Sequence, residues 1–266
     1  MKTWIVFIVS FLALDLYFQL SVQWAPNVVW KLAAIGLFFP FVYFVMKWTN
    51  KGGFRELGLH FHAKWRRNLL YGFLIGFSFW ANKYGIEYAF GAFEIKGINA
   101  GPDMGWMTLE IVGGFFLGSL VNDLIVRGFV FAQLKDKLSI PRIFVLSVFL
   151  YSMEDIWMEG FSLGNTIFSV VLGLSLTYAF MYTGSIWANT GLHWGLNVCY
   201  GMFNGMVGDG GGGIFIIENG TNTIASELTG YIIPLLMFFF VWKFRAIFCE
   251  SLTADEPPEV KKALTS

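Results

Sequence analysis

The sequence predicts an all-α fold, a polytopic transmembrane bundle of about eight helices with both termini in the cytoplasm. Of the 266 residues, 56% are hydrophobic and 14% are charged, whereas a soluble domain carries about 25% charged residues. Apolar stretches long enough to cross a membrane recur along the whole chain. Lysine and arginine gather in alternate connecting segments, which is typical of a multi-pass membrane protein.

Each expected helix is an apolar stretch of roughly the 20 residues that a membrane span needs. Acidic residues crowd the turn between the fifth and sixth stretches, so seven helices is the alternative count. The first stretch is interpreted as a retained helix, because no small-residue cleavage site follows it. The eight stretches are 4–22, 28–48, 69–90, 106–132, 143–158, 164–183, 185–206 and 229–248.

Basic residues set the expected orientation of the bundle. The segments that follow the second, fourth and eighth helices hold most of them, and the segments after the third, fifth and seventh are poorer. Eight spans with both termini in the cytoplasm place all the basic segments on one side of the membrane. We therefore expect one transmembrane domain over residues 1–250 and a short cytoplasmic tail over 251–266, in the plasma (inner) membrane if the chain is prokaryotic.

Composition also excludes several kinds of partner. Eighteen basic residues balance eighteen acidic ones, so no nucleic-acid partner is expected. Cys199 and Cys249 lie far apart in apolar stretches and are interpreted as packing residues. His60 and His62 alternate, but no carboxylate or cysteine stands near them in the sequence, so they are interpreted as solvated or interfacial residues. One histidine and one aspartate in the expected cavity are a thin ligand set, so we expect no metal; no cofactor is expected either.

The fourth expected helix carries three polar residues inside its apolar stretch: Asn122, Asp123 and Arg127. Burying such groups costs several kcal/mol unless they pair with one another or face a polar cavity. Asp123 and Arg127 stand four residues apart, on one helix face, and can form an ion pair. His193 and Asn197 in the seventh helix have the same spacing.

Helical rise tests whether these groups can meet. Counted from the cytoplasmic helix ends, Asn122 lies roughly 13 Å deep and His193 roughly 10 Å deep, whereas Asp155 in the fifth helix lies roughly 20 Å deep. Polar groups at one level in two helices predict a buried polar cavity. The simpler alternative is that Asp123–Arg127 and His193–Asn197 only hold the bundle together.

The order of these motifs is similar to that of a known family. Asn122-Asp123-x-x-x-Arg127-Gly128-Phe129 resembles the Glu-Glu-x-x-x-Arg-Gly signature of the CAAX protease and bacteriocin-processing (CPBP) family of intramembrane endopeptidases. His193-x-x-x-Asn197 resembles the last motif of that family, and Leu57-Gly58-Leu59 and the eight-helix layout are also similar. The family-like core covers about residues 106–206.

The resemblance implies general-base hydrolysis. In the family, the first glutamate and a histidine from a Phe-x-x-x-His motif activate water, and the final histidine and asparagine stabilise the oxyanion. Here the first glutamate position holds Asn122, whose amide cannot accept a proton near neutral pH. Asp123 keeps the second carboxylate. In the middle motif, Tyr151 matches the phenylalanine and Asp155 the histidine, while the alternative register, Phe149 to Met153, offers no proton acceptor.

Two hypotheses follow for the candidate site. In the first, the chain cleaves membrane-associated peptides, with Asp155 as the base, Asn122 orienting water, and His193 and Asn197 holding the oxyanion. In the second, it is a pseudoenzyme that binds a membrane peptide or partner helix as a scaffold, immunity or assembly factor. Losing a catalytic base costs about 10²–10⁴ in rate, so the sequence favours impaired or absent protease activity.

A third class of function, small-solute transport, is disfavoured. Many secondary transporters have a pair of interrupted helices in matching halves, and the sequence shows no such pair. The expected partners are therefore the lipid bilayer and a membrane-associated peptide or protein.

Overall fold

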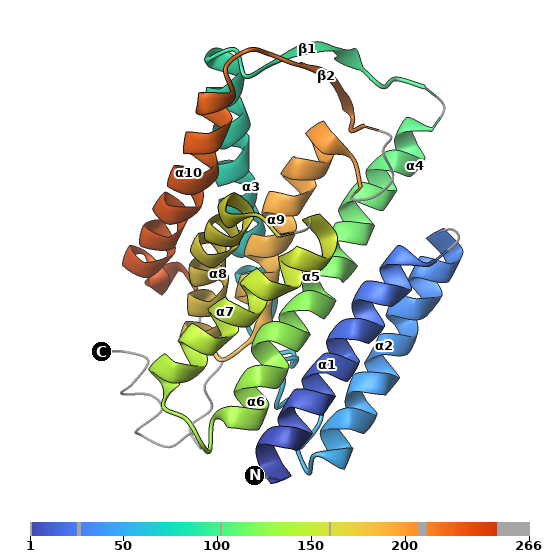
Figure 1. Ribbon diagram of the computed structural model, residues 1–266, viewed down its shortest axis with the longest axis vertical. Helices are drawn as coiled ribbons and strands as arrows, with labels where there is room; N and C mark the ends of the chain where they lie inside the picture. Colours follow the sequence, from blue (N-terminus) through green and yellow to red (C-terminus); the bar gives the residue numbers. More distant parts are fainter. Residues whose placement is uncertain (1, 26–27, 102, 160, 207–211, 249–266) are drawn as a thin grey trace.

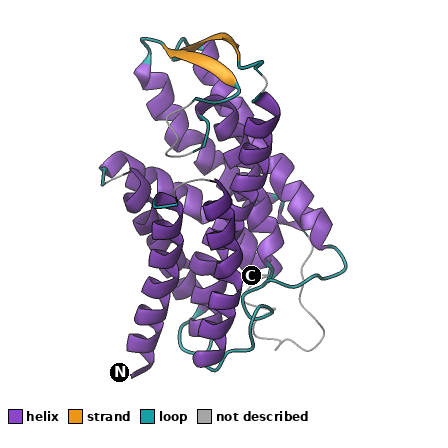
Figure 2. Ribbon diagram, turned by 90° about the vertical axis from the view of Figure 1, so that its right-hand side faces the viewer, coloured by secondary structure: helices purple, strands orange, loops and turns teal. Residues whose placement is uncertain are grey.

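The computed structural model is a helix bundle capped at one end by a small two-stranded β-sheet (Figures 1 and 2). It describes residues 2–25, 28–101, 103–159, 161–206 and 212–248, so the expected tail lies outside the described residues. Within them the chain forms eight continuous helices, as the sequence predicts. The helices are α1 (Lys2–Gln23), α2 (Val28–Trp48), α3 (Trp65–Ala89), the fourth helix (Met104–Leu134), α7 (Ile140–Glu159), α8 (Leu163–Thr183), α9 (Ile186–Asn204) and α10 (Thr223–Lys243).

The fourth helix is continuous but not uniform. In order it consists of α4 (Met104–Leu109), a π-helical turn η1 (Glu110–Gly114), α5 (Phe115–Asp123), a second π-helical turn η2 (Leu124–Phe129) and α6 (Val130–Leu134). A π-helical turn rotates the side chains that follow it relative to a regular α-helix, and such turns are frequent at functional sites. The η2 turn begins directly after Asp123 and contains Arg127.

Five of the described helices are long and apolar enough to cross a membrane: α1, α2, the fourth helix, α8 and α10. Large apolar side chains such as Leu37, Phe44 and Leu236 are exposed on the outer helices, as expected where lipid replaces water. The other three long helices, α3, α7 and α9, carry more polar residues.

A two-stranded antiparallel sheet lies across one end of the bundle (Figure 1). Strands β1 (Phe93–Ile98) and β2 (Phe215–Asn219) pair from Phe93 with Asn219 to Ile98 with Phe215, and the register shifts between Ile95 and Gly97. The predicted elements do not include these strands. A short η3 turn (Arg245–Ile247) follows α10. Helix α10 starts at Thr223, earlier than the expected 229. Its first turns are polar, so apolar length alone did not include them.

Helices α3 and α9 touch backbone to backbone. Each presents two glycines four residues apart to the other: Gly72 and Gly76 on α3, and Gly191 and Gly195 on α9. A Cβ atom at Gly76 would lie 2.1 Å from the carbonyl oxygen of Leu192. Pairs of small residues at this spacing allow membrane helices to approach closely. The contact fixes the position of α9, which carries the candidate residues His193 and Asn197.

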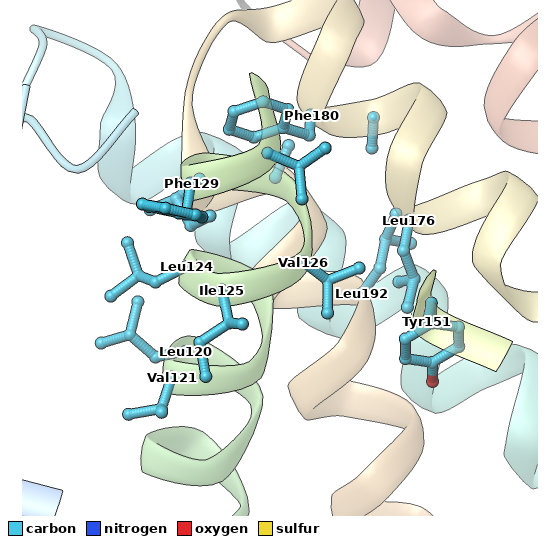
Figure 3. Close-up of a cluster of buried hydrophobic side chains, with 14 of the residues drawn as sticks. Leu120, Val121, Leu124, Ile125, Val126, Phe129, Tyr151, Leu176, Phe180 and Leu192 are labelled. Atoms are coloured by element: carbon cyan, nitrogen blue, oxygen red, sulfur yellow. The ribbon is translucent and has the colours of Figure 1, made fainter. Parts of the chain in front are cut away.

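The η2 turn lies in the centre of the apolar core. Figure 3 shows Leu124, Val126 and Phe129 among side chains from α7, α8 and α9, including Leu176, Phe180 and Leu192. Leu124, Ile125, Val126 and Phe129 are fully buried. The polar cluster that includes Arg127 of this turn is therefore enclosed by an apolar core.

The segment Leu57-Gly58-Leu59 packs against both η2 and the start of α9. A Cβ atom at Gly128 would lie 2.6 Å from the carbonyl oxygen of Leu57, so the close contact requires glycine after Arg127. Gly58 has φ +76°, and its carbonyl oxygen accepts a hydrogen bond from the backbone N–H of Ile186 at 3.1 Å. The segment thus holds the N-terminal end of α9 beside the fourth helix.

The two histidines that follow this segment are half-buried. The backbone oxygen of His60 accepts a hydrogen bond from Nε1 of Trp187 at 2.8 Å. Burial, together with the charge of His60, lowers the pKa of His62 below its ordinary value. His62 is therefore neutral near neutral pH, and His60 contributes to packing through its backbone.

Candidate functional site

The ion pair expected from the sequence is present at the centre of the bundle. Nη1 of Arg127 donates to Oδ1 of Asp123 at 2.6 Å, and both side chains are fully buried. Removing either partner of such a pair leaves an uncompensated charge in the interior. The pair therefore constrains the end of α5 and the η2 turn.

Asp123 also connects the fourth helix to α9. Oγ1 of Thr190 donates to Oδ2 of Asp123 at 2.9 Å, and Nδ1 of His193 lies 3.4 Å from Oδ1. With Arg127, Thr190 and His193 around it, the Asp123 carboxylate is engaged on both oxygens. Asp123 thus orients other groups and is poorly placed to accept a proton from water. Thr190 is a contact that sequence reasoning missed, because threonine carries no chemical signal of its own.

Tyr151 of α7 completes this part of the cluster. The guanidinium carbon of Arg127 lies 4.5 Å from the centre of the Tyr151 ring, a cation–π arrangement. The Tyr151 ring also meets the His193 ring edge to face, with centroids 5.9 Å apart. The fourth helix, α7 and α9 therefore meet around Arg127.

Asn122 contacts a carboxylate that the sequence analysis did not select. Its Nδ2 donates to Oε2 of Glu154, a residue of α7 that is 3% exposed. Nη1 of Arg127 lies 3.4 Å from Oδ1 of Asn122. The Asn122 amide thus lies between the guanidinium and the Glu154 carboxylate. Its oxygen faces the positively charged guanidinium, and its NH2 group donates to the carboxylate.

Asp155, the base expected from the sequence, is the next residue of α7. Its side chain lies outside the described residues. Leu150 and Glu154 have the same four-residue spacing, but the sequence alone gives no reason to prefer them to Tyr151 and Asp155.

Asn197 lies one turn beyond His193 on α9. Its Nδ2 donates to Oγ of Ser119, a buried residue of α5, at 3.2 Å. The hydrogen bond brings Asn197 to the same helix that carries Asn122 and Asp123. The structure thus brings together five of the six predicted residues: Asn122, Asp123, Arg127, His193 and Asn197.

The described residues contain no group of three or more histidine, cysteine, aspartate or glutamate side chains that could hold a metal ion. The polar cluster instead contains a carboxylate, an amide, an imidazole and an ion pair. These groups can exchange protons and donate hydrogen bonds to a developing negative charge.

Comparison with known proteins gives one family match. Residues 104–199 match the model described as Rce1-like: Type II CAAX prenyl endopeptidase Rce1-like. No curated protein and no solved structure matches the chain. The matched region runs from the start of the fourth helix into α9 and contains every cluster residue described above. The chain is thus an integral membrane protein whose residues 104–199 are Rce1-like, which confirms the expected resemblance to the CPBP family.

Proposed function

We propose that the protein is an intramembrane peptide hydrolase that acts on membrane-associated peptides and uses Glu154 as its general base. The observation that carries the proposal is the hydrogen bond from Asn122 to Glu154 inside a buried polar cluster. In the family pattern, a glutamate occupies the position of Asn122. A carboxylate from α7 here reaches the same position.

The proposed reaction begins with a water molecule next to Glu154. Glu154 takes one proton from the water, and the water oxygen attacks the peptide carbonyl carbon. The Asn122 amide holds the Glu154 carboxylate in place. The C–N bond then breaks, and the leaving amine receives the proton from Glu154.

His193 and Asn197 suit the stabilisation of the oxyanion. His193 faces the Asp123 carboxylate through Nδ1, which favours a proton on that nitrogen. In its protonated form the ring also has a donor at Nε2. Asn197 adds an amide donor one turn further along α9. Two preorganised donors in an apolar site contribute strongly to the stabilisation of a tetrahedral intermediate.

A second function, binding without cleavage, is favoured by Asn122 itself. An amide at the position of the family's first glutamate removes one of its two water-activating groups. The scaffold would then hold a membrane peptide or partner helix without hydrolysing it, as an immunity or assembly factor would.

The two functions differ in a cleavage assay with purified protein in proteoliposomes. The substrates are prenylated and unprenylated peptides anchored in the same vesicles. We expect wild type to cleave, and Glu154→Gln to lower kcat by about 10²–10⁴, the usual contribution of a general base. The matched control is Glu87→Gln, because Glu87 is equally buried but pairs with Lys83 on α3.

Cleavage by Glu87→Gln at the wild-type rate assigns the loss to the site. Equal cleavage by wild type and Glu154→Gln would exclude Glu154 as the base. Saturable binding of the peptides without any cleavage by wild type would establish the second function instead.

A further inference from the structure

Basic residues form one surface at the end of the bundle opposite the β1–β2 sheet, where α3 begins and α10 ends (Figure 1). Nη2 of Arg67, in the first turn of α3, donates to the backbone oxygen of Ile247 in η3 at 3.1 Å. Nη1 of Arg245, the first residue of η3, donates to the hydroxyl of Tyr178 on α8 at 3.4 Å. These contacts hold the start of α3 beside the end of α10. We call the five cations of this region the basic surface: Lys64, Arg66, Arg67, Lys243 and Arg245.

The basic surface carries positive charge that no described carboxylate balances. Among the described residues, none of its five cations forms a salt bridge. No aspartate or glutamate occurs in the segments that build this side of the bundle end, which are 57–86, 161–208 and 228–249. Elsewhere at the same end, Lys51 pairs with Asp136 at 2.8 Å, and Lys135 pairs with Glu56 at 2.7 Å. The unbalanced charge is therefore concentrated beside α3 and α10, and it suits an anionic ligand.

Aromatic rings border the basic surface. Phe61, Trp65 and Trp187 pack against one another, with ring centroids 4.8 to 5.3 Å apart. Phe61 is 72% exposed, and the guanidinium carbon of Arg66 lies 5.4 Å from the centre of the Trp65 ring. Trp242, in the last turn of α10, is also exposed. Aromatic rings are enriched at the membrane–water interface, and lysine and arginine near helix ends extend their charged groups to it. The basic surface therefore has the composition of a segment at the level of the lipid headgroups.

We propose that the basic surface binds the headgroups of anionic phospholipids. Phosphate oxygens accept charge-assisted hydrogen bonds from guanidinium and ammonium groups. A lipid fits this surface better than an acidic protein does, because it offers a phosphate to the cations and acyl chains to the exposed rings of Phe61 and Trp242. The orientation expected from the basic segments places this end of the bundle in the cytoplasm, where the membrane leaflet carries anionic lipids. The proposal is independent of whether the protein cleaves peptides.

Native mass spectrometry of the full-length protein in detergent tests the proposal. The probes are phosphatidylglycerol and phosphatidylcholine with the same acyl chains, and the measured quantity is the Kd of the first lipid bound. We expect wild type to bind phosphatidylglycerol more tightly than phosphatidylcholine. The triple substitution Lys64→Gln, Arg66→Gln and Lys243→Gln should weaken phosphatidylglycerol binding at least about tenfold, since each basic residue near an anionic membrane surface contributes about fivefold. These three side chains are exposed, so thermal unfolding and the Kd for phosphatidylcholine should stay unchanged.

The matched control removes the same charge from another part of the same end. The triple substitution Lys47→Gln, Lys137→Gln and Arg142→Gln, also at exposed positions, should bind phosphatidylglycerol as wild type does. Equal weakening in both triple variants would show a general effect of net charge and would overturn the proposal. Unchanged binding in the first triple variant, or equal affinity of wild type for the two lipids, would overturn it as well. A preference for phosphatidylglycerol that appears only after Asp255→Asn with Glu256→Gln would assign the basic surface to the acidic residues of the tail instead of to lipid.

Discussion

Replacing Asp123 with asparagine is expected to leave Arg127 as a buried cation without its counter-ion. Both side chains are fully buried, and the broken contact is the 2.6 Å ion pair. Nε and Nη2 of Arg127 have no acceptor among the described residues, and the neutral Asn122 amide and Tyr151 ring that contact the guanidinium do not replace a counter-ion. Breaking a buried ion pair costs about 3–5 kcal/mol, and we expect Asp123→Asn to destabilise the protein by that amount.

The magnitude is tested with a double-mutant cycle of Asp123→Asn and Arg127→Met. Unfolding is followed by titration with SDS in mixed micelles. Because the double mutant has no unpaired charge, we expect it to be more stable than either single mutant, with a coupling energy of at least about 2 kcal/mol. Additive effects, or a loss below about 1 kcal/mol in Asp123→Asn, would refute the assignment of this pair as the structural centre of the bundle.

Three further predictions concern packing, the oxyanion and pH. Gly76→Val should destabilise the bundle by about 1–3 kcal/mol through overpacking, whereas Gly85→Ala, with open space around it, should not; thermal unfolding measures both. Asn197→Ala should lower kcat by about 10²–10³ with KM unchanged in steady-state cleavage assays, and a change in KM alone would argue against an oxyanion role. The hydrogen bond from Lys51 lowers the pKa of the exposed Asp136 carboxyl. The small stabilisation by this interaction is therefore present above the ordinary pKa and is lost as the pH falls through the folded value. Asp136→Asn should abolish this loss of stability in acid unfolding, and an unchanged loss would exclude Asp136.

Most of the fold could be predicted from the sequence because it depends on two periodic signals. Apolar length located the eight helices, since a membrane span must bury every backbone polar group within itself. Four-residue spacing predicted the Asp123–Arg127 pair and the common face of His193 and Asn197. Both kinds of signal are local in the sequence, so they can be recognised in a single chain.

The contact between Asn122 and Glu154 was beyond the sequence. It depends on how α7 packs against the fourth helix, and the sequence alone does not give that packing. The π-helical turn after Asp123 changes the register of the facing residues, and no residue pattern indicates such a turn.

The central claim is that water activated by Glu154 attacks a peptide bond within the bundle. Its most direct test is cleavage of a membrane-anchored peptide in water enriched in ¹⁸O, followed by mass spectrometry of the product. We predict that wild type incorporates one ¹⁸O atom into the new carboxyl terminus and that Glu154→Gln yields no labelled product above background. Unlabelled product from wild type, or labelled product at equal rates from both proteins, would contradict the claim.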